Sequence, residues 1–213
     1  DPSVAAVFIT TRHNSHAVQA IAALRAGKHV WVEKPLCLKA EELDEIAATL
    51  SAARTAEGRP VTLMVGFNRR FAPMAVALRD ALAKQSGPFK VAITINAGRL
   101  ERDHWTLNPA VGGGRIVGEG CHFVDLVRFL AGSPIGTVRC LRRDTDGQDG
   151  GTFEVSCVSG TVAVIDYRTD LPPHIPKEKI EVTGGAFAAT IHNWARLTSE
   201  GLGGVRIGAA WGG

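Results

Sequence analysis

Apolar residues in the first 70 positions alternate between short continuous runs and helical spacing. The runs at residues 4–10, 29–33 and 61–67 are rich in valine and isoleucine, which is typical of buried strands. Between them, residues 15–27 and 39–57 repeat apolar side chains every three or four positions, which predicts two helices. This β-α-β-α-β order predicts a parallel sheet with right-handed crossovers, about half of a Rossmann dinucleotide-binding domain.

After residue 71 the pattern changes to strands of alternating polarity. Helices are predicted at residues 73–84 and 121–130, separated by a half-buried strand at 89–95. Further strands are predicted at residues 137–142, 152–158, 161–168, 179–183 and 187–191. We therefore expect a C-terminal half of a Rossmann sheet over residues 1–70, followed by an α+β domain over residues 71–213 with a large, mainly antiparallel sheet and helices on one face.

Composition excludes several classes of protein. The net charge of +3 is small and the basic residues are scattered, so nucleic acid is not an expected partner. No apolar run approaches the roughly 18 residues of a membrane span. The four cysteines are widely spaced, which favours reduced thiols over disulfides or a metal site. These features are typical of a cytoplasmic globular protein.

Residues 27–35, which read GKHVWVEKP, carry the clearest candidate chemistry. Pro35 cannot continue a strand, so Glu33 and Lys34 are expected at the carboxyl end of a parallel strand, where α/β sheets bind ligands. A cis peptide bond before Pro35 would aim Lys34 inward. The alternative is an ordinary solvated lysine at a strand end.

A second candidate is the histidine in the first turn of the helix at 121–130. The positive end of the helix dipole disfavours protonation of His122, which suits a general base, and Asp125 lies three residues further on the same face. Removing a hydroxyl proton while hydride leaves carbon requires such a base. Taken alone, a histidine in this position more often has a structural role at the helix entry.

Four segments in this order resemble the motifs of the Gfo/Idh/MocA oxidoreductases, which include glucose-fructose oxidoreductase and inositol dehydrogenase. They are the strand and histidine at 4–16, the GKHVWVEKP segment, VGFNRRF at 65–71 and GGGRIVGEGCHFVD at 112–125. The resemblance implies hydride transfer between NAD or NADP and a hydroxyl or carbonyl group of a sugar, polyol or related small molecule.

The same resemblance implies roles for particular residues. Catalysis falls to Lys34 and His122. The cofactor side is implied to involve Thr10, Thr11, Asn14, His16, Glu33, Lys34 and Pro35, and the substrate side Arg69, Trp105, Glu119 and Asp125; no metal is implied. Helix capping is the alternative role for the threonines and Asn14, a salt bridge for Arg69, and aromatic packing for Trp105.

The chain also departs from the family pattern. It carries no Gly-x-Gly-x-x-Gly turn, and Gly118 stands where the family commonly has an aspartate, with the carboxylate of Glu119 one residue later. The sequence Gly-Glu-Gly-Cys-His resembles a branch in which this part follows a zinc-type alcohol dehydrogenase part. We expect a fragment of a longer enzyme, inactive in isolation and a weak binder of nucleotide. The alternative is a non-catalytic, sugar-sensing or oligomerisation module.

Assembly is predicted from the second sheet. If helices cover one face only, the other face exposes side chains such as Val162, Val164 and Val182. Relatives resemble one another in stacking such faces between subunits. We therefore expect a homodimer or higher homo-oligomer formed through the open sheet face, with a small molecule as substrate and with neither nucleic acid nor a membrane as partner.

Overall fold

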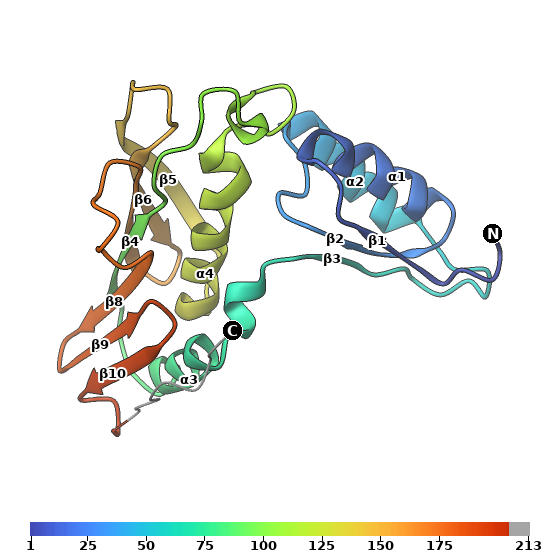
Figure 1. The fold of residues 1–213 in the computed structure, drawn as a ribbon. Coiled ribbons are helices and arrows are strands. Elements are labelled where there is room, and N and C mark those ends of the chain that lie inside the picture. Colours follow the sequence, from blue (N-terminus) through green and yellow to red (C-terminus); the bar gives the residue numbers. More distant parts are fainter. Residues whose placement is uncertain (205–213) are drawn as a thin grey trace. The chain divides into compact units, whose positions relative to one another are not determined.

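The computed structural model describes residues 1–204 (Figure 1). The chain forms two compact units: the first combines residues 1–67 with 103–121, and the second combines 68–102 with the chain from 122 onward. The first unit is therefore discontinuous in sequence. Separate functions for residues 1–70 and 71–213 remain a prediction.

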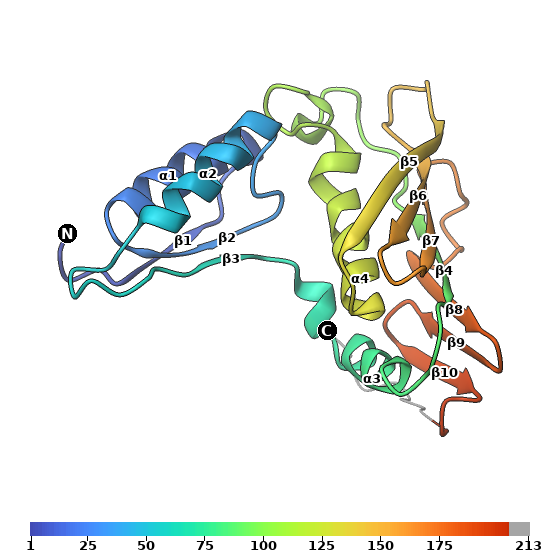
Figure 2. The same cartoon turned by 180° about the vertical axis from the view of Figure 1, so that it is seen from behind.

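The first unit contains the predicted parallel sheet. Strands β1 (Ala6–Ile9), β2 (His29–Val32) and β3 (Leu63–Val65) lie in that order, and both pairs are parallel. Helices α1 (His16–Arg25) and α2 (Ala40–Ala52) form the two crossovers and cover the same face of the sheet (Figure 2). The Rossmann half of the fold prediction is confirmed.

The core of the first unit forms where helix and strand apolar positions meet. Ile9, Leu24, Val32 and Ile46 are each at most 2% exposed. Helix α2 ends five residues before the predicted limit of 57, because the backbone turns extended at Ala53 (ψ 138°). Apolar spacing continued past that point, but the backbone did not follow it.

The second unit contains a seven-stranded sheet of order β10-β9-β8-β4-β7-β6-β5, in which only the β4–β7 pair is parallel. The mainly antiparallel prediction is confirmed. Its elements are a 3₁₀ turn (Asn68–Phe71), α3 (Pro73–Leu82), β4 (Lys90–Asn96), α4 (Cys121–Ala131), β5 (Ile135–Arg143), β6 (Gly151–Cys157), β7 (Val162–Arg168), β8 (Glu178–Gly184), β9 (Phe187–His192) and β10 (Arg196–Glu200). Strand β10 was not predicted, because its residues are mostly polar.

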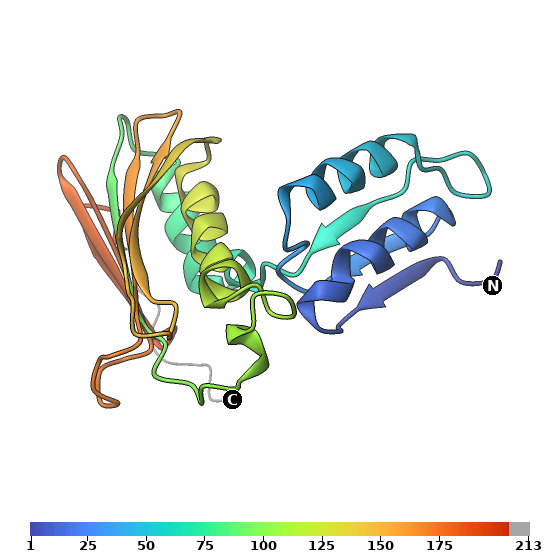
Figure 3. The same ribbon diagram turned by 90° about the horizontal axis from the view of Figure 1, so that it is seen from above.

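Helices α3 and α4 lie against one face of this sheet, and no described helix covers the other (Figure 3). Side chains alternate between the faces. Val182 is fully buried together with Ile180, so its assignment to the open face was wrong: it stands on the helix side of β8. Val164 is 37% exposed and lies in register between Glu154 and Ala92. The open face is therefore not a continuous apolar patch.

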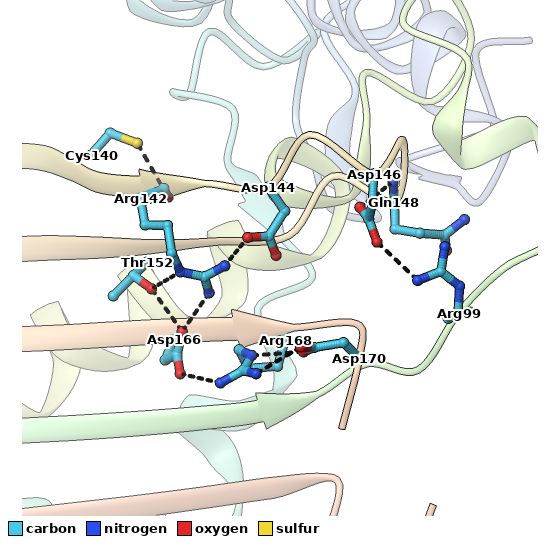
Figure 4. Close-up of polar contacts among 10 residues, drawn as sticks. All are labelled: Arg99, Cys140, Arg142, Asp144, Asp146, Gln148, Thr152, Asp166, Arg168 and Asp170. Atoms are coloured by element: carbon cyan, nitrogen blue, oxygen red, sulfur yellow. Dashed lines mark hydrogen bonds and ion pairs between the residues drawn. The ribbon is translucent and has the colours of Figure 1, made fainter. Parts of the chain in front are cut away.

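Charged side chains gather at one end of the open face (Figure 4). Arg142 contacts Asp144 and lies 3.1 Å from Asp166, while Arg168 holds Asp170 through two hydrogen bonds of 2.8 Å. Both Arg168 donors bind the same carboxylate, and this raises the pKa of Arg168 and lowers that of Asp170. This part of the open face is therefore covered by a network of ion pairs.

The segment before α4, residues 103–121, belongs to the first unit. A 3₁₀ turn (Trp105–Leu107) precedes the glycine run, and a π-helical turn (Ile116–Gly120) leads into α4. Gly113 and Gly114 have φ of 74° and 87°, which favours glycine, and Gly112 packs directly on the backbone of Thr106. π-helical turns are frequent at functional sites, and this one contains Gly118.

Candidate functional site

Lys34 follows the carboxyl end of β2 and is partly buried. Its Nζ donates a hydrogen bond of 2.9 Å to the carbonyl oxygen of Gly118, and its backbone N–H donates to Glu33 Oε2 at 3.2 Å. The Glu33 N–H donates to the Ile9 carbonyl at 2.9 Å, so the ladder continues one residue past the strand. The Lys34–Pro35 bond is cis, as expected. These contacts fix the direction of the lysine side chain.

His16 joins the loop after β1 to the loop after β2. Its Nδ1 lies 2.7 Å from the Pro35 carbonyl oxygen and its Nε2 lies 2.9 Å from that of Thr11. The ring is 0% exposed. In the structure His16 therefore holds the backbone beside Lys34.

The remaining residues predicted for the cofactor side lie at the same strand ends. Thr10, Thr11 and Asn14 are exposed. Thr11 Oγ1 lies 2.7 Å from Ser15 Oγ, and the Asn14 N–H donates to the carbonyl of Val111 at 3.1 Å. Thr11 and Asn14 thus shape the loop, while cofactor contact by all three residues stays a prediction.

His13 was missed by the sequence reasoning. Its Nδ1 lies 2.8 Å from the Gly112 carbonyl oxygen, and its ring packs edge-on against Trp105 with centroids 4.7 Å apart. A Cβ on Gly118 would lie 2.8 Å from His13 Cε1, so the imidazole occupies the space of a side chain at position 118. Its place directly after β1 was the available signal.

Trp105 and Glu119 have partners in the same unit. The Trp105 ring stacks on His104 with centroids 6.1 Å apart, and the Arg12 guanidinium lies 5.6 Å from its centroid. Glu119 is 43% exposed and lies 3.7 Å from the buried Arg115. Trp105 therefore shows the packing role that was its alternative, and substrate contact by either residue stays a prediction.

Two residues predicted for the site lie on α4 in the second unit. His122 is 6% exposed and Asp125 is 8% exposed. Asp125 receives two hydrogen bonds from Arg70: 2.9 Å from Nε to Oδ2, and a second from Nη2 to Oδ1. This bidentate bond raises the pKa of Arg70, so Asp125 acts as its counter-ion in the structure.

Arg69 is held in a similar fork by Glu178, whose side chain is 4% exposed. Arg69 Nε donates to Oε2 at 2.9 Å and Nη2 donates to Oε1, while Trp194 Nε1 donates to Oε2 at 2.6 Å. The guanidinium also lies 5.0 Å from the Phe123 ring centroid. The salt bridge named as the alternative for Arg69 is present and partly buried, with the Arg69 side chain 20% exposed. Substrate binding by Arg69 stays a prediction.

In the first unit the structure brings the predicted residues His16, Lys34 and Pro35 together with two that were not predicted, His13 and Gly118. We call these five residues the Lys34 cluster. His122, Asp125 and Arg69 belong to the second unit. The Lys34 cluster is a partly buried ammonium group beside a buried imidazole, both fixed at the carboxyl ends of parallel strands. Such an arrangement can bind a hydroxyl group and accept its proton.

Two family models match the chain. "Oxidoreductase family, NAD-binding Rossmann fold" matches residues 1–67, and "GFO/IDH/MocA C-terminal domain" matches residues 87–187. These are the parallel sheet with its two helices and most of the antiparallel sheet. The chain belongs to the Gfo/Idh/MocA family, as the sequence motifs indicated.

The chain is similar to several sugar oxidoreductases. It is 31% identical over 197 residues to D-xylose 1-dehydrogenase (NADP(+)) 2 of Haloferax volcanii, covering 89% of this chain and 57% of that enzyme. It is 36% identical over 134 residues to 1,5-anhydro-D-fructose reductase of Ensifer adhaerens, covering 61% of this chain and 38% of the relative. The chain thus spans 57% and 38% of these two relatives.

A crystal structure supports the fold assignment. Aldose-aldose oxidoreductase from Caulobacter crescentus superposes with a TM-score of 0.80 at 23% identity, covering 97% of this chain and 63% of that one. The similarity extends over both units. Within residues 1–204, no helix is both long and apolar enough to cross a bilayer.

Proposed function

We propose that these residues form part of an NAD(P)-dependent oxidoreductase that interconverts a hydroxyl and a carbonyl group on a sugar, a polyol or a related small molecule. The observation that carries the proposal is the position of Lys34: it follows a parallel strand, and its ammonium group is fixed on the Gly118 carbonyl. The family membership and the sugar oxidoreductases among the relatives support the substrate class. We place the protein in the cytoplasm.

The residues present fit one end of a nicotinamide nucleotide. Thr10 and Thr11 are exposed at the carboxyl end of β1, and Glu33 and Lys34 follow β2. When bound, the oxidised nicotinamide would take up the hydride that leaves the substrate carbon. The glycine-rich turn that grips a pyrophosphate does not occur in residues 1–213.

In this proposal Lys34 binds the substrate hydroxyl and His122 is a group that takes its proton. The ammonium of Lys34 stabilises negative charge that develops on oxygen. The π-helical turn (Ile116–Gly120) runs directly into α4, so His122 does not lie at the start of the helical segment and the helix-dipole effect predicted from the sequence does not apply to it. Arg69, Trp105, Glu119 and Asp125 are assigned to shaping the substrate side.

The proposed function is tested with the full-length protein that contains these residues. Each member of a panel of aldoses, anhydrosugars and inositols is offered with NAD and with NADP. Reduction of the nucleotide is followed by the absorbance of the reduced nicotinamide. Nucleotide reduction with at least one polyol or sugar is the expected result. Absence of turnover in both directions with every panel member and both nucleotides would refute the proposal.

We predict that the 213-residue chain alone binds NAD(H) and NADP(H) weakly or not at all. The parallel strands offer the nicotinamide end a site, but the helix N-terminus and glycine turn that bind pyrophosphate are not among these residues. Isothermal titration calorimetry is the measurement. A dissociation constant in the range of about 1–10 µM for either nucleotide would contradict the prediction.

A second candidate function is a non-catalytic, sugar-sensing or oligomerisation module. Two observations favour it. The side chains of Asp125 and Arg69 are already engaged in ion pairs within the chain, and position 118 has no side chain. This function predicts that the full-length protein binds a sugar with no nucleotide turnover. The activity assay above, combined with sugar titration, separates the two functions.

We also propose a homo-oligomer formed through the open face of the seven-stranded sheet, and predict that Val164→Lys dissociates it. Val164 is 37% exposed on that face, where burying a lysine ammonium in the interface carries a desolvation cost. The oligomeric state is measured by light scattering with the protein at tens of micromolar, roughly the concentration at which a stable interface stays associated.

The matched control is Val158→Lys, because Val158 is 72% exposed just beyond the end of β6. It should leave the oligomer intact. A monomeric wild-type protein at the same concentration would rule out this assembly.

A further inference from the structure

His13 is the group in the Lys34 cluster to which the proposed function gives no role. It is 8% exposed, in the 3₁₀ turn (His13–Ser15) directly after β1. Most buried histidines serve packing. The contacts of His13 define its tautomer, its orientation and its neighbours.

The tautomer of His13 follows from its hydrogen bond. Nδ1 lies 2.8 Å from the carbonyl oxygen of Gly112, and a carbonyl oxygen only accepts. Nδ1 therefore carries the proton. In the neutral imidazole the lone pair is then on Nε2, which leaves that nitrogen able to accept a proton.

The ring is fixed on three sides. The Gly112 carbonyl holds one nitrogen, Trp105 packs edge-on at 4.7 Å between centroids, and the backbone of Gly118 fills the space beside Cε1. Any side chain at position 118 would begin 2.8 Å from Cε1, closer than real Cβ atoms approach. The absence of a side chain at Gly118 is thus a requirement of the His13 position.

His13 and Lys34 meet at the same residue. Lys34 Nζ donates to the Gly118 carbonyl oxygen at 2.9 Å, and the His13 ring packs on that residue from Cε1. The ammonium group of Lys34 and an imidazole whose Nε2 carries the lone pair thus both border Gly118. This is the pairing that alcohol oxidation needs.

The charges around His13 favour the neutral form. Burial is the largest effect and lowers the pKa of His13 below its ordinary value; the hydrogen bond to the Gly112 carbonyl opposes it, and the neighbouring Lys34 and His16 lower the pKa further. A lowered pKa leaves the ring neutral at pH 7. The base is then present in the form that accepts a proton.

We infer that His13, rather than His122, is the catalytic residue of the proposed oxidoreductase that accepts the proton of the substrate hydroxyl, on Nε2. The inference rests on the proposed function. The O–H bond breaks, its proton goes to Nε2, and its electron pair forms the second bond of the product carbonyl. The hydride from the same carbon goes to the oxidised nicotinamide nucleotide, and the imidazole becomes an imidazolium.

The first test reads the imidazole itself and needs no turnover. The chain with ¹⁵N-labelled histidine is titrated by NMR, with His13 assigned from His13→Asn. Protonated Nδ1, unprotonated Nε2 and a titration midpoint below the ordinary histidine value are expected. An imidazolium at pH 7, or a proton on Nε2, would overturn the inference.

The second test is the pH profile of kcat/KM for alcohol oxidation by the full-length protein. The rate of the wild-type protein should fall as pH decreases through the His13 pKa. His13→Asn keeps an N–H donor but no base; it should lower kcat/KM about 10² to 10⁴-fold and remove this acid limb. His174→Asn, in an exposed loop, is the matched control and should change neither.

Gly118→Ala adds a test of geometry. Its Cβ must displace the imidazole, and a misplacement near 1 Å costs about 10²-fold in turnover. Gly185→Ala is the control, because a Cβ there meets nothing within 4 Å. An acid limb retained in His13→Asn with near-normal rate overturns the inference and leaves the proposed function standing. Absence of turnover in the wild-type protein overturns the proposed function, and the NMR result then decides whether His13 is a proton acceptor.

Discussion

Replacing Lys34 with alanine is expected to lower the turnover of the full-length protein by about 10² to 10⁴-fold, the usual cost of losing a group that acts on the reacting proton or the charge beside it. His122→Ala should have an effect in the same range if His122 takes the hydroxyl proton, and a smaller effect if His13 takes it. Lys34 makes one side-chain hydrogen bond, to the Gly118 carbonyl. Its loss should therefore change activity far more than stability.

Steady-state kinetics and denaturant unfolding of the same preparations make the comparison. Lys28→Ala is the matched control: its Nζ donates to the Asp1 carbonyl at 3.1 Å on the exposed surface, and its loss should alter neither quantity. Near-normal turnover in both Lys34→Ala and His122→Ala would remove these residues from the mechanism. A fall in activity that follows a fall in stability would assign them a structural role.

Glu178→Ala is expected to destabilise the chain by up to roughly 3–5 kcal/mol, because it leaves the partly buried guanidinium of Arg69 without its counter-ion. The carboxylate is 4% exposed and receives hydrogen bonds from Arg69 and Trp194. The Glu178–Arg69 ion pair joins the start of β8 to the 3₁₀ turn before α3. The free energy of unfolding in urea or guanidinium is the measurement.

The control for this loss is an exposed ion pair. Arg25 and Glu45 lie 2.8 Å apart with side chains 65% and 52% exposed, so Glu45→Ala should cost less than about 1 kcal/mol. Equal losses in the two variants would show that burial does not amplify the Arg69 pair. Glu178→Gln should fall between them, since the amide keeps an acceptor for one donor.

Periodicity predicted most of the fold because apolar spacing directly encodes which face is buried. Both sheets were predicted, as were the crossover helices and α4. Strand β10 was missed because Arg196–Glu200 is mostly polar, and its pairing with β9 depends on backbone hydrogen bonds. Val182 was assigned to the wrong face because the predicted strand bounds did not determine which of the alternating side chains face the helices.

The site was harder to predict because its partners are distant in sequence. The position of Lys34 after a strand could be read locally. The contact of its Nζ with Gly118 joins residues 84 positions apart, and the His13 to Gly112 bond spans 99. Neither leaves a periodic signal. The forks of Arg69 and Arg70 were likewise invisible, because their carboxylates lie 109 and 55 residues away.

The first unit is assembled from two separate stretches of chain, and the polypeptide passes between the units after residues 67, 102 and 121. During synthesis the parallel sheet can therefore form early, but Gly112 and Gly118 emerge from the ribosome only after α3 and β4 have been made. A gene fragment that stops at residue 67 would encode Lys34 and His13 without the turn that orients both. The smallest stretch of gene that encodes the complete Lys34 cluster runs from the loop after β1 to the start of α4. Recombination within that span would separate Lys34 from the residues that position it.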